Sequence, residues 1–191
     1  MAIIINNLNV KYDNKIVLKG LNLTIQDGEH VAFTGPSGIG KTSFINALMG
    51  LVPYEGDIIL PSKSRISTVF QEDRLFEGLS VYRNIKMVCD RQNSDNIKEY
   101  IINAGLEPDS KVYALSGGMK RRTSILRAIL SPFDILILDE PFKGLDTVTK
   151  SDIMSMVQKK ASQKTMLLIT HDPSEALYFN SRIIDFSSFC D

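Results

Sequence analysis

The feature that most restricts the fold of this chain is a glycine-rich stretch, GPSGIGKTS, at residues 35–43. It follows a short apolar run, HVAFT at 30–34, and precedes a helical pattern over 41–50. The spacing G-x-x-x-x-G-K-[ST] between a strand and a helix is the pattern of a phosphate-binding loop. Its glycines let the backbone curl with the N–H groups facing inward. A glycine-rich turn that matches by accident is the competing interpretation, and the strand–loop–helix context argues against it.

The remaining pattern alternates apolar strands with helices. Residues 2–34 are predicted to be mostly strands, with a turn at Gln26–Gly28. Further strands are predicted at 57–60, 65–70, 134–139, 165–170 and 182–186, and helices at 94–106, 116–131, 148–161 and from Pro173. The whole segment 80–110 is more polar and helical in pattern. Continuous apolar strands between helices predict a parallel sheet buried on both faces. Ligands of such sheets bind at the carboxyl ends of the strands.

Bulk composition narrows the class of protein. The chain has 191 residues, enough for one domain, and carries 22 basic and 22 acidic residues, so its net charge does not indicate nucleic-acid binding. Cys89 and Cys190 lie far apart and form no CxxC pair, which disfavours a disulfide framework or a zinc site. The N-terminus lacks the pattern of a secretory signal, and no run reaches the roughly 18 to 20 apolar residues of a membrane span. Work at a membrane is therefore expected to go through a partner.

Two acidic residues end one predicted strand, in ILILDE at 135–140. Unpaired carboxylates are costly at the end of a buried strand, so the pair needs a reason. Asp139 at the strand tip suits Mg²⁺, held directly or through water. Glu140 points elsewhere and suits the polarisation of an attacking water. A solvated strand end is the competing interpretation, and the motif gains its weight from the phosphate loop.

Three further side chains are candidates on position and chemistry. Gln71 and His171 also follow predicted strands, where an amide could bind Mg²⁺ or water and an imidazole could contact a terminal phosphate. Each also fits a plain surface or structural role when taken alone. Tyr12 could stack on a purine base or be an ordinary half-buried strand tyrosine, and its position between two strands leaves both open.

A second anion-binding pattern lies downstream, LSGGM at 115–119, where two glycines after a serine open a basic amphipathic helix. Taken alone it duplicates the first loop. In that first loop, Lys41 can reach the β- and γ-phosphates of a nucleotide, and Thr42 can offer a hydroxyl to Mg²⁺. A small domain has no evident need for two such loops.

In their order along the chain, these motifs resemble the ATP-binding cassette (ABC) family over nearly the whole sequence. The motifs are Tyr12, GPSGIGKT, Gln71, LSGGM, ILILDE, GLD at 144–146 and His171. The most specific of them is LSGG shortly before the acid-tipped strand, which other phosphate-loop enzymes lack. In this family two domains pair head to tail, and LSGG of one covers the ATP held by the loop of the other.

The resemblance implies a role for each position. The implied ATP-binding residues are Tyr12, Gly35, Pro36, Ser37, Gly38, Ile39, Gly40, Lys41, Thr42 and Ser43, and those serving the partner's ATP are Ser116, Gly117, Gly118 and Asp146. The implied catalytic residues are Glu140 as base, His171 as switch, Lys41 and Gln71, and the implied Mg²⁺ ligands are Thr42, Gln71 and Asp139.

The resemblance also implies a fold, an α/β P-loop NTPase. It has a RecA-like core with a mostly parallel sheet, an antiparallel N-terminal β-subdomain and a small helical subdomain. We place all 191 residues in one domain, with the core at about 1–75 and 125–191 and the helical subdomain at about 76–124. The implied activity is ATP hydrolysis with Mg²⁺, which would energise transport of an unidentified solute.

The implied partners are a second copy or a paralogous ATPase subunit, transmembrane permease subunits and an extracytoplasmic solute-binding protein, with no nucleic acid. The expected location is the cytoplasmic face of the cell membrane, as a peripheral subunit. Residues 69–85, LSGGMKRR and THDPSEAL resemble importers of the nitrate, sulfonate and taurine type, although the segment between Gln71 and Ser116 is short for the family. The alternatives are a soluble family member, such as one of the iron–sulfur assembly type, and an unrelated phosphate-loop kinase with an accidental LSGG.

Overall fold

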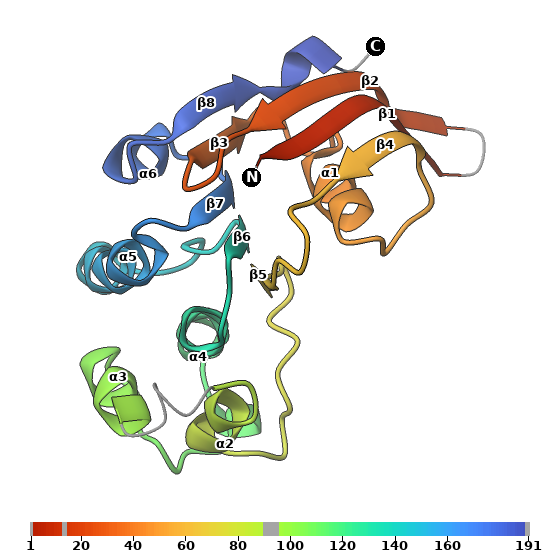
Figure 1. Cartoon of the computed structure of the whole chain (residues 1–191). Coiled ribbons are helices and arrows are strands. Elements are labelled where there is room, and N and C mark those ends of the chain that lie inside the picture. The colour runs from red at the N-terminus through yellow and green to blue at the C-terminus, as the bar shows by residue number, and fades with distance from the viewer. Residues whose placement is uncertain (1, 13–14, 90–95, 190–191) are drawn as a thin grey trace. The chain divides into compact units, whose positions relative to one another are not determined.

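The computed structural model describes residues 2–12, 15–89 and 96–189, and the chain forms two compact units. Unit one comprises Met1–Ser64 and Gln163–Asp191, and unit two comprises Arg65–Ser162. Figure 1 shows the elements of both. These two units are defined by contacts between residues. The division predicted from the family resemblance, into a core and a helical subdomain at about 76–124, stays a prediction.

Unit one contains two groups of strands. Its elements are β1 (Ile3–Tyr12), β2 (Lys15–Ile25), β3 (His30–Thr34), α1 (Lys41–Leu48), β4 (Glu55–Ile59), β7 (Thr165–Ile169), α6 (Pro173–Tyr178), β8 (Arg182–Asp185) and η3 (Phe186–Phe189). β1 lies between β2 and β4, and both pairings are antiparallel, which confirms the predicted N-terminal β-subdomain. β3 lies between β7 and β8, and both pairings are parallel. The predicted turn at residues 26–28 is also present, where the Glu29 N–H donates to the Gln26 carbonyl.

Three phenylalanines fix β3 against the helix that follows it. Phe33 of β3, Phe44 of α1 and Phe186 of η3 are fully buried, with ring centroids 5.0 to 5.6 Å apart. Tilted and edge-to-face aromatic pairs of this kind contribute about 0.5 to 1.5 kcal/mol each beyond the area that they bury. Because Phe33 precedes the glycine loop and Phe44 follows it, this cluster holds both ends of the loop.

Unit two is built around one long helix. Its elements are β5 (Ile66–Val69), α2 (Val81–Lys86), α3 (Ile97–Asn103), η2 (Val112–Ala114), α4 (Gly117–Leu130), β6 (Ile135–Asp139) and α5 (Thr147–Ala161). α4 packs on β5, α2, α3 and α5, and Figure 1 shows it between the strands and the two shorter helices. β5 and β6 pair in parallel, and every residue of β6 is buried. A strand buried on both faces reads as a continuous apolar run, which is why β6 was predictable.

The described residues of the segment 80–110 contain less helix than its pattern predicts. The described part of this segment forms two short helices, α2 and α3, and residues 104–110 form turns. α2 begins at Ser80, whose hydroxyl accepts a hydrogen bond from the Arg83 N–H. The helix predicted at 94–106 corresponds to α3, and its predicted start at residue 94 lies outside the described residues.

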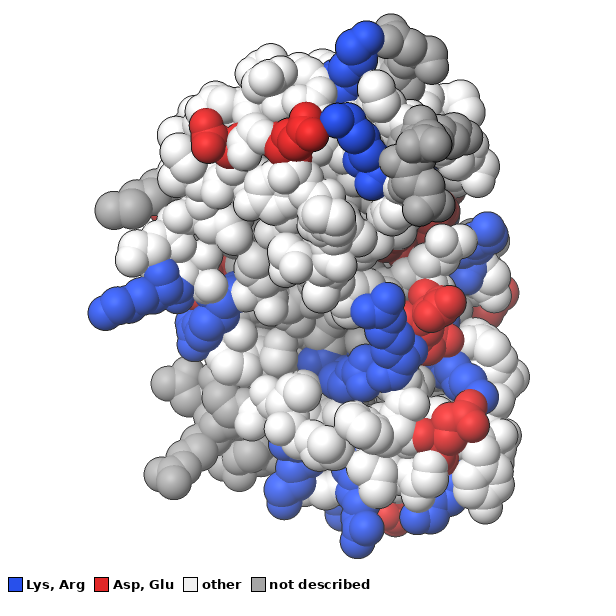
Figure 2. Space-filling view, turned by 90° about the vertical axis from the view of Figure 1, so that its right-hand side faces the viewer, with Lys and Arg blue, Asp and Glu red and all other residues white. Residues whose placement is uncertain are grey.

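The surface carries charges of both signs. On the face that Figure 2 shows, Lys and Arg side chains are interspersed with Asp and Glu across uncharged surface. Within residues 2–12, 15–89 and 96–189, the helices are all too short or too polar to cross a bilayer.

One backbone contact in unit one depends on a glycine. β1 is irregular between Asn6 and Asn9, and Asn7 has a left-handed φ of 49°. Gly56 of β4 faces this irregularity with a φ of 98°, and a Cβ there would lie 2.3 Å from the Asn7 carbonyl oxygen. Such a distance is not tolerated between real atoms, so β1 and β4 can pair as they do only with glycine at position 56.

We expect Gly56→Ala to destabilise the protein by more than about 2 kcal/mol, because it combines left-handed strain with a backbone clash. Gly50→Ala is the matched control. Gly50 also has a positive φ, 66°, but a Cβ there meets open space, so only the strain of about 1 to 2 kcal/mol applies. Urea unfolding of both variants measures the difference. Equal losses would show that the β1–β4 contact does not require the glycine.

Candidate functional site

The predicted phosphate loop connects β3 to α1 in unit one. Gly40 ends the loop with a φ of 107°, and a Cβ there would lie 2.8 Å from the Val17 carbonyl oxygen of β2. Gly38 has a φ of 80° and open space at its Cβ position. α1 begins at Lys41 with no side-chain cap on its first N–H groups. An uncapped helix N-terminus beside an open glycine loop is a suitable site for an anion.

Lys41 lies across this loop. Its side chain is buried, and Nζ donates to the carbonyl oxygens of Gly35 at 2.7 Å and Pro36 at 2.9 Å. A buried ammonium needs such partners, because desolvation disfavours the charged form. The lysine is therefore folded over the strand-to-loop junction, and its positive charge lies within the loop that it is predicted to serve.

Tyr12 lies at the end of β1, and 41% of its surface is exposed. Its backbone pairs with Lys15 of β2, two residues before the Val17 that contacts the loop at Gly40. At about 3.3 Å per strand residue, the end of the β1–β2 hairpin lies about 7 Å along β2 from that contact. The residue is thus partly exposed, and the same unit carries the loop.

His171 follows β7 at the same edge as the loop. β3 and β7 are parallel neighbours, with Phe33 opposite Ile169, so Gly35 and His171 each come two residues beyond a paired position. The turn around the histidine is tied down by Thr170, whose hydroxyl donates to Glu175 at 2.6 Å and accepts from the Asp172 N–H at 3.0 Å. His171 itself is exposed.

Unit two repeats this arrangement with its own pair of strands. Val69 of β5 lies opposite Leu138 of β6, so Gln71 and Glu140 each come two residues beyond a paired position. Asp139 is 3% exposed at the tip of β6. Glu140 has a left-handed φ of 49°, which costs a non-glycine residue about 1 to 2 kcal/mol. Strain of this kind clusters at functional sites, since the surrounding structure must maintain it.

The LSGGM loop forms the start of α4. Ser116 is the N-cap, and its hydroxyl accepts from the Met119 N–H at 3.3 Å. Ser116 and Gly117 are exposed, and a Cβ at Gly117 would meet open space. A Cβ at Gly118 would lie 3.8 Å from the Gly144 carbonyl oxygen and 3.7 Å from Leu145. The LSGGM loop therefore lies against the GLD segment, and the two form one surface.

Asp146 completes this surface at the start of α5. Its carboxylate accepts from the Thr149 N–H at 3.0 Å, and this hydrogen bond holds the pKa of Asp146 below its usual range. A helix N-terminus favours a negative side chain for the same reason. The structure thus brings together Ser116, Gly117, Gly118 and Asp146, the four residues predicted to serve a partner's nucleotide.

The loop that carries Gln71 is held by side chains that sequence reasoning missed. Arg121, Ser124 and Arg127 of α4 all donate to backbone carbonyl oxygens within residues 70–74. The sequence shows these side chains three residues apart, a spacing that places them along one face of the helix. The pattern showed a basic amphipathic helix but not what its basic side chains bind.

The predicted Mg²⁺ ligands are divided between the units, with Thr42 in unit one and Gln71 and Asp139 in unit two. They offer a hydroxyl, an amide oxygen and a carboxylate, which are the hard oxygen donors that Mg²⁺ prefers. No group of three or more His, Cys, Asp or Glu side chains converges on a metal position in the part of the chain that the structure describes. Each of the three predicted ligands thus fits Mg²⁺ by its chemistry.

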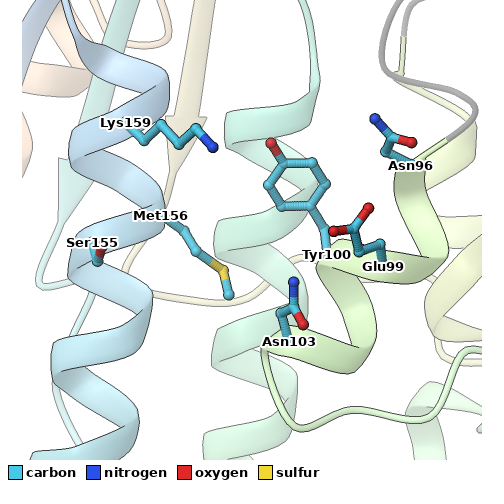
Figure 3. A pocket seen from close by; sticks show the side chains of 7 residues that line it. All are labelled: Asn96, Glu99, Tyr100, Asn103, Ser155, Met156 and Lys159. Atoms are coloured by element: carbon cyan, nitrogen blue, oxygen red, sulfur yellow. The ribbon is translucent and has the colours of Figure 1, made fainter.

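A pocket of about 260 Å³ opens between α3 and α5 of unit two. Figure 3 shows Lys159 reaching from α5 toward Tyr100 of α3 across this pocket. The lining residues are Asn96, Glu99, Tyr100, Asn103, Ser155, Met156 and Lys159. None of them is a predicted site residue, so this pocket is separate from the strand ends and loops described above.

Comparison with known proteins places the chain in a family. The family model described as ABC transporter matches residues 18–143. The aliphatic sulfonates import ATP-binding protein of Bacillus cereus is 37% identical over 187 residues, covering 90% of this chain and 74% of that protein. The spermidine/putrescine import ATP-binding protein of Spiroplasma citri is 34% identical over 200 residues, covering 94% of this chain and 57% of that protein.

A solved structure agrees with these relatives. An ATP-binding cassette in a dimeric post-hydrolysis state, bound to ADP and Pi, matches with a TM-score of 0.81 at 28% identity. The match covers 97% of this chain and 94% of that one. It confirms the predicted α/β fold of a P-loop NTPase. The chain belongs to the ABC transporter family and is an ATP hydrolase of the ABC type.

Proposed function

We propose that the chain is the ATPase subunit of a solute importer and that it works as a head-to-tail dimer with two ATP molecules between the copies. The observation that carries this proposal is the surface formed by the LSGGM loop and Asp146. Its Gly117 is open, its serine caps a helix N-terminus, and it offers an anion site in addition to the phosphate loop. A second copy that presents its own phosphate loop and ATP to this surface gives both sites a use.

In unit one, the proposed roles follow from charge and position. The loop N–H groups and the start of α1 would hold the β- and γ-phosphates. Lys41 would exchange its two carbonyl partners for phosphate oxygens, which are better acceptors for an ammonium. His171, at the same strand edge, would contact the γ-phosphate, and Tyr12 would stack on adenine. These groups position the nucleotide and stabilise charge in the transition state.

In unit two, the proposed roles separate two adjacent acids. Asp139, buried at the tip of β6, would hold the Mg²⁺ that accompanies ATP, with Thr42 and Gln71 as the other protein ligands. Glu140, at the next position, has a left-handed backbone and would accept a proton from the attacking water.

The importer assignment rests on the relatives, and the solute does not follow from it. One relative is named for sulfonate import and the other for polyamine import. Sulfonates are anions and polyamines are cations, yet the two relatives are 37% and 34% identical to this chain. Solute choice therefore belongs to partners, which we propose to be transmembrane permease subunits and an extracytoplasmic binding protein. The chain would act at the inner face of the membrane.

The dimer can be tested with Glu140→Gln, which removes the proposed base while keeping the side-chain volume. We expect this variant to bind ATP without turnover and to shift from 21.3 kDa to about twice that mass with ATP, but not with ADP. Light scattering after gel filtration measures the mass. The double variant Glu140→Gln/Lys41→Ala is the control and is expected to stay monomeric. A Glu140→Gln protein that binds ATP and remains monomeric at high concentration would contradict the dimer.

The head-to-tail arrangement can be tested by mixing two inactive variants. Ser116→Arg blocks the LSGGM loop but keeps the phosphate loop, and Lys41→Ala does the reverse, so we expect each alone to lose hydrolysis. We expect their mixture to recover hydrolysis, because a mixed dimer contains one site with both halves intact. ATP titration should show that Ser116→Arg retains near-normal affinity. A mixture as inactive as its parts would mean that Ser116 serves its own chain's nucleotide.

The transport role predicts membrane partners. We expect the tagged Glu140→Gln chain, isolated from its own cells in mild detergent with ATP, to retain integral membrane proteins that mass spectrometry identifies as permease subunits. The same preparation of Lys41→Ala/Ser116→Arg, tagged identically, controls for carry-over by detergent. Recovery of soluble partners alone would favour the iron–sulfur assembly alternative.

A further inference from the structure

One stripe of α4 binds the loop that carries Gln71. Arg121 Nη1 donates to the Phe70 carbonyl oxygen at 2.7 Å, and its Nη2 donates to the Gln71 carbonyl oxygen. One guanidinium thus holds two consecutive carbonyl groups, a geometry that suits the planar fork of arginine and that the single ammonium of lysine cannot reproduce. The residue is only 9% exposed, so these bonds are shielded from water.

Two more side chains extend this contact along the loop. Ser124 Oγ and Arg127 Nη2 both donate to the Asp73 carbonyl oxygen at 3.2 Å. Arg127 Nη1 donates to the Arg74 carbonyl oxygen at 2.9 Å. The loop also closes on itself, because the Arg74 guanidinium lies 3.7 Å from the centre of the Phe70 ring.

The charge of Arg121 is balanced within the same contact. The Asp73 carboxylate lies 3.3 Å from Arg121 Nη1, and Asp73 Oδ1 is buried without a hydrogen bond among the described residues. Burial raises the pKa of the Asp73 carboxyl, while the Arg121 charge acts against that rise. Removing the arginine would leave a partly buried carboxylate without its counter-charge and two carbonyl groups without their donor, which costs more than losing a fully exposed ion pair.

Arg121 shares its helix with the LSGGM loop. Ser116 caps α4 five residues before Arg121, about 7.5 Å along the helix axis. A helix is stiff over this length, so a displacement of residues 70–74 that keeps these hydrogen bonds must displace Ser116 with it. A displacement that breaks these hydrogen bonds leaves the Arg121 guanidinium without its acceptors. Keeping the hydrogen bonds costs less free energy, so the loop and the start of α4 are expected to move together.

We propose that Arg121 is the positioning residue that links Gln71 to Ser116, so that the Gln71 loop and the LSGGM loop of one chain act as a single body during hydrolysis. The proposal rests on the proposed function, since Ser116 must serve a partner's ATP for the link to affect turnover. Arg121 is not proposed to touch a reacting atom. It acts by fixing the backbone of one loop to the helix that begins at the other.

The chain supplies a matched control at the next position. Arg122 belongs to the same helix, but its guanidinium donates elsewhere: Nη1 donates to the Ala104 and Gly105 carbonyl oxygens at the end of α3, and Nε donates to the Gly118 carbonyl oxygen of its own helix at 3.3 Å. Substitutions of Arg122 therefore remove the same charge and several hydrogen bonds from α4, including one at Gly118 of the LSGGM loop, without releasing the Gln71 loop.

The experiment compares Arg121→Gln and Arg121→Lys with Arg122→Gln and Arg122→Lys in the full chain. We expect Arg121→Gln to lower kcat by about tenfold or more at saturating ATP while leaving the ATP Kd unchanged, because the phosphate loop is intact. Arg121→Lys keeps the charge but not the fork, and should lose less. Amide hydrogen exchange should rise at residues 70–74 in both Arg121 variants and not in the Arg122 variants.

The outcomes separate positioning from plain stabilisation. Equal kcat losses in Arg121→Gln and Arg122→Gln, or faster exchange spread over all of unit two, would overturn the proposal. So would a large change in ATP Kd, because Arg121 would then serve the nucleotide rather than the link. If Arg121→Gln does not fold, Arg121→Lys decides by the same readouts. Absence of hydrolysis in the unaltered chain would defeat the proposed function instead, and the exchange measurement would still test the loop-to-helix contact.

Discussion

The phosphate loop depends on the way its two ends are held. Phe33 and Phe44 lie on either side of the loop in sequence and pack together with Phe186, so β3 and α1 cannot separate without opening the aromatic core of unit one. At the far end, Gly40 lies so close to the Val17 carbonyl that a side chain has no room. A loop fixed in this way can leave its central glycine, Gly38, with open space and positive φ, because its shape does not rely on side-chain contacts of its own.

In both units, candidate site residues lie at or just beyond the ends of parallel strands. Each has parallel strands in direct pairing, and each sets polar side chains one or two residues beyond the paired positions. The strands supply rigid ends, and the residues beyond them are free to take unusual backbone angles, as Glu140 does. Neighbouring acids in one short motif therefore differ in their surroundings, with Asp139 buried at the strand tip and Glu140 held at a positive φ.

Much of this organisation was predictable because it depends on local pattern. The strand–loop–helix around 35–43 and the buried run of β6 follow from periodicity, and both are present. The described part of 80–110 contains less helix than predicted, because polar residues with helical spacing also suit turns when tertiary contacts supply their hydrogen bonds. Asn84 illustrates this. Its buried amide donates to the carbonyl oxygens of Phe76 and Ser80 and accepts from the Phe76 N–H, contacts that no spacing rule reveals.

Candidate site residues within one continuous segment could also be predicted from the sequence, whereas contacts between distant segments could not. Phosphate-loop residues are predictable because the loop is one continuous segment whose geometry each glycine serves. The Arg121 contact is not, because its donor and its acceptors are about 50 positions apart and the acceptors are backbone carbonyls, which every residue has. A side chain that recognises backbone leaves no trace in the identity of the residues it binds. The motif LSGGM therefore identifies the loop that we propose to face a partner's nucleotide. The arginine two residues past it, which ties that loop's helix to the Gln71 loop, could be assigned only once both segments were seen in one unit.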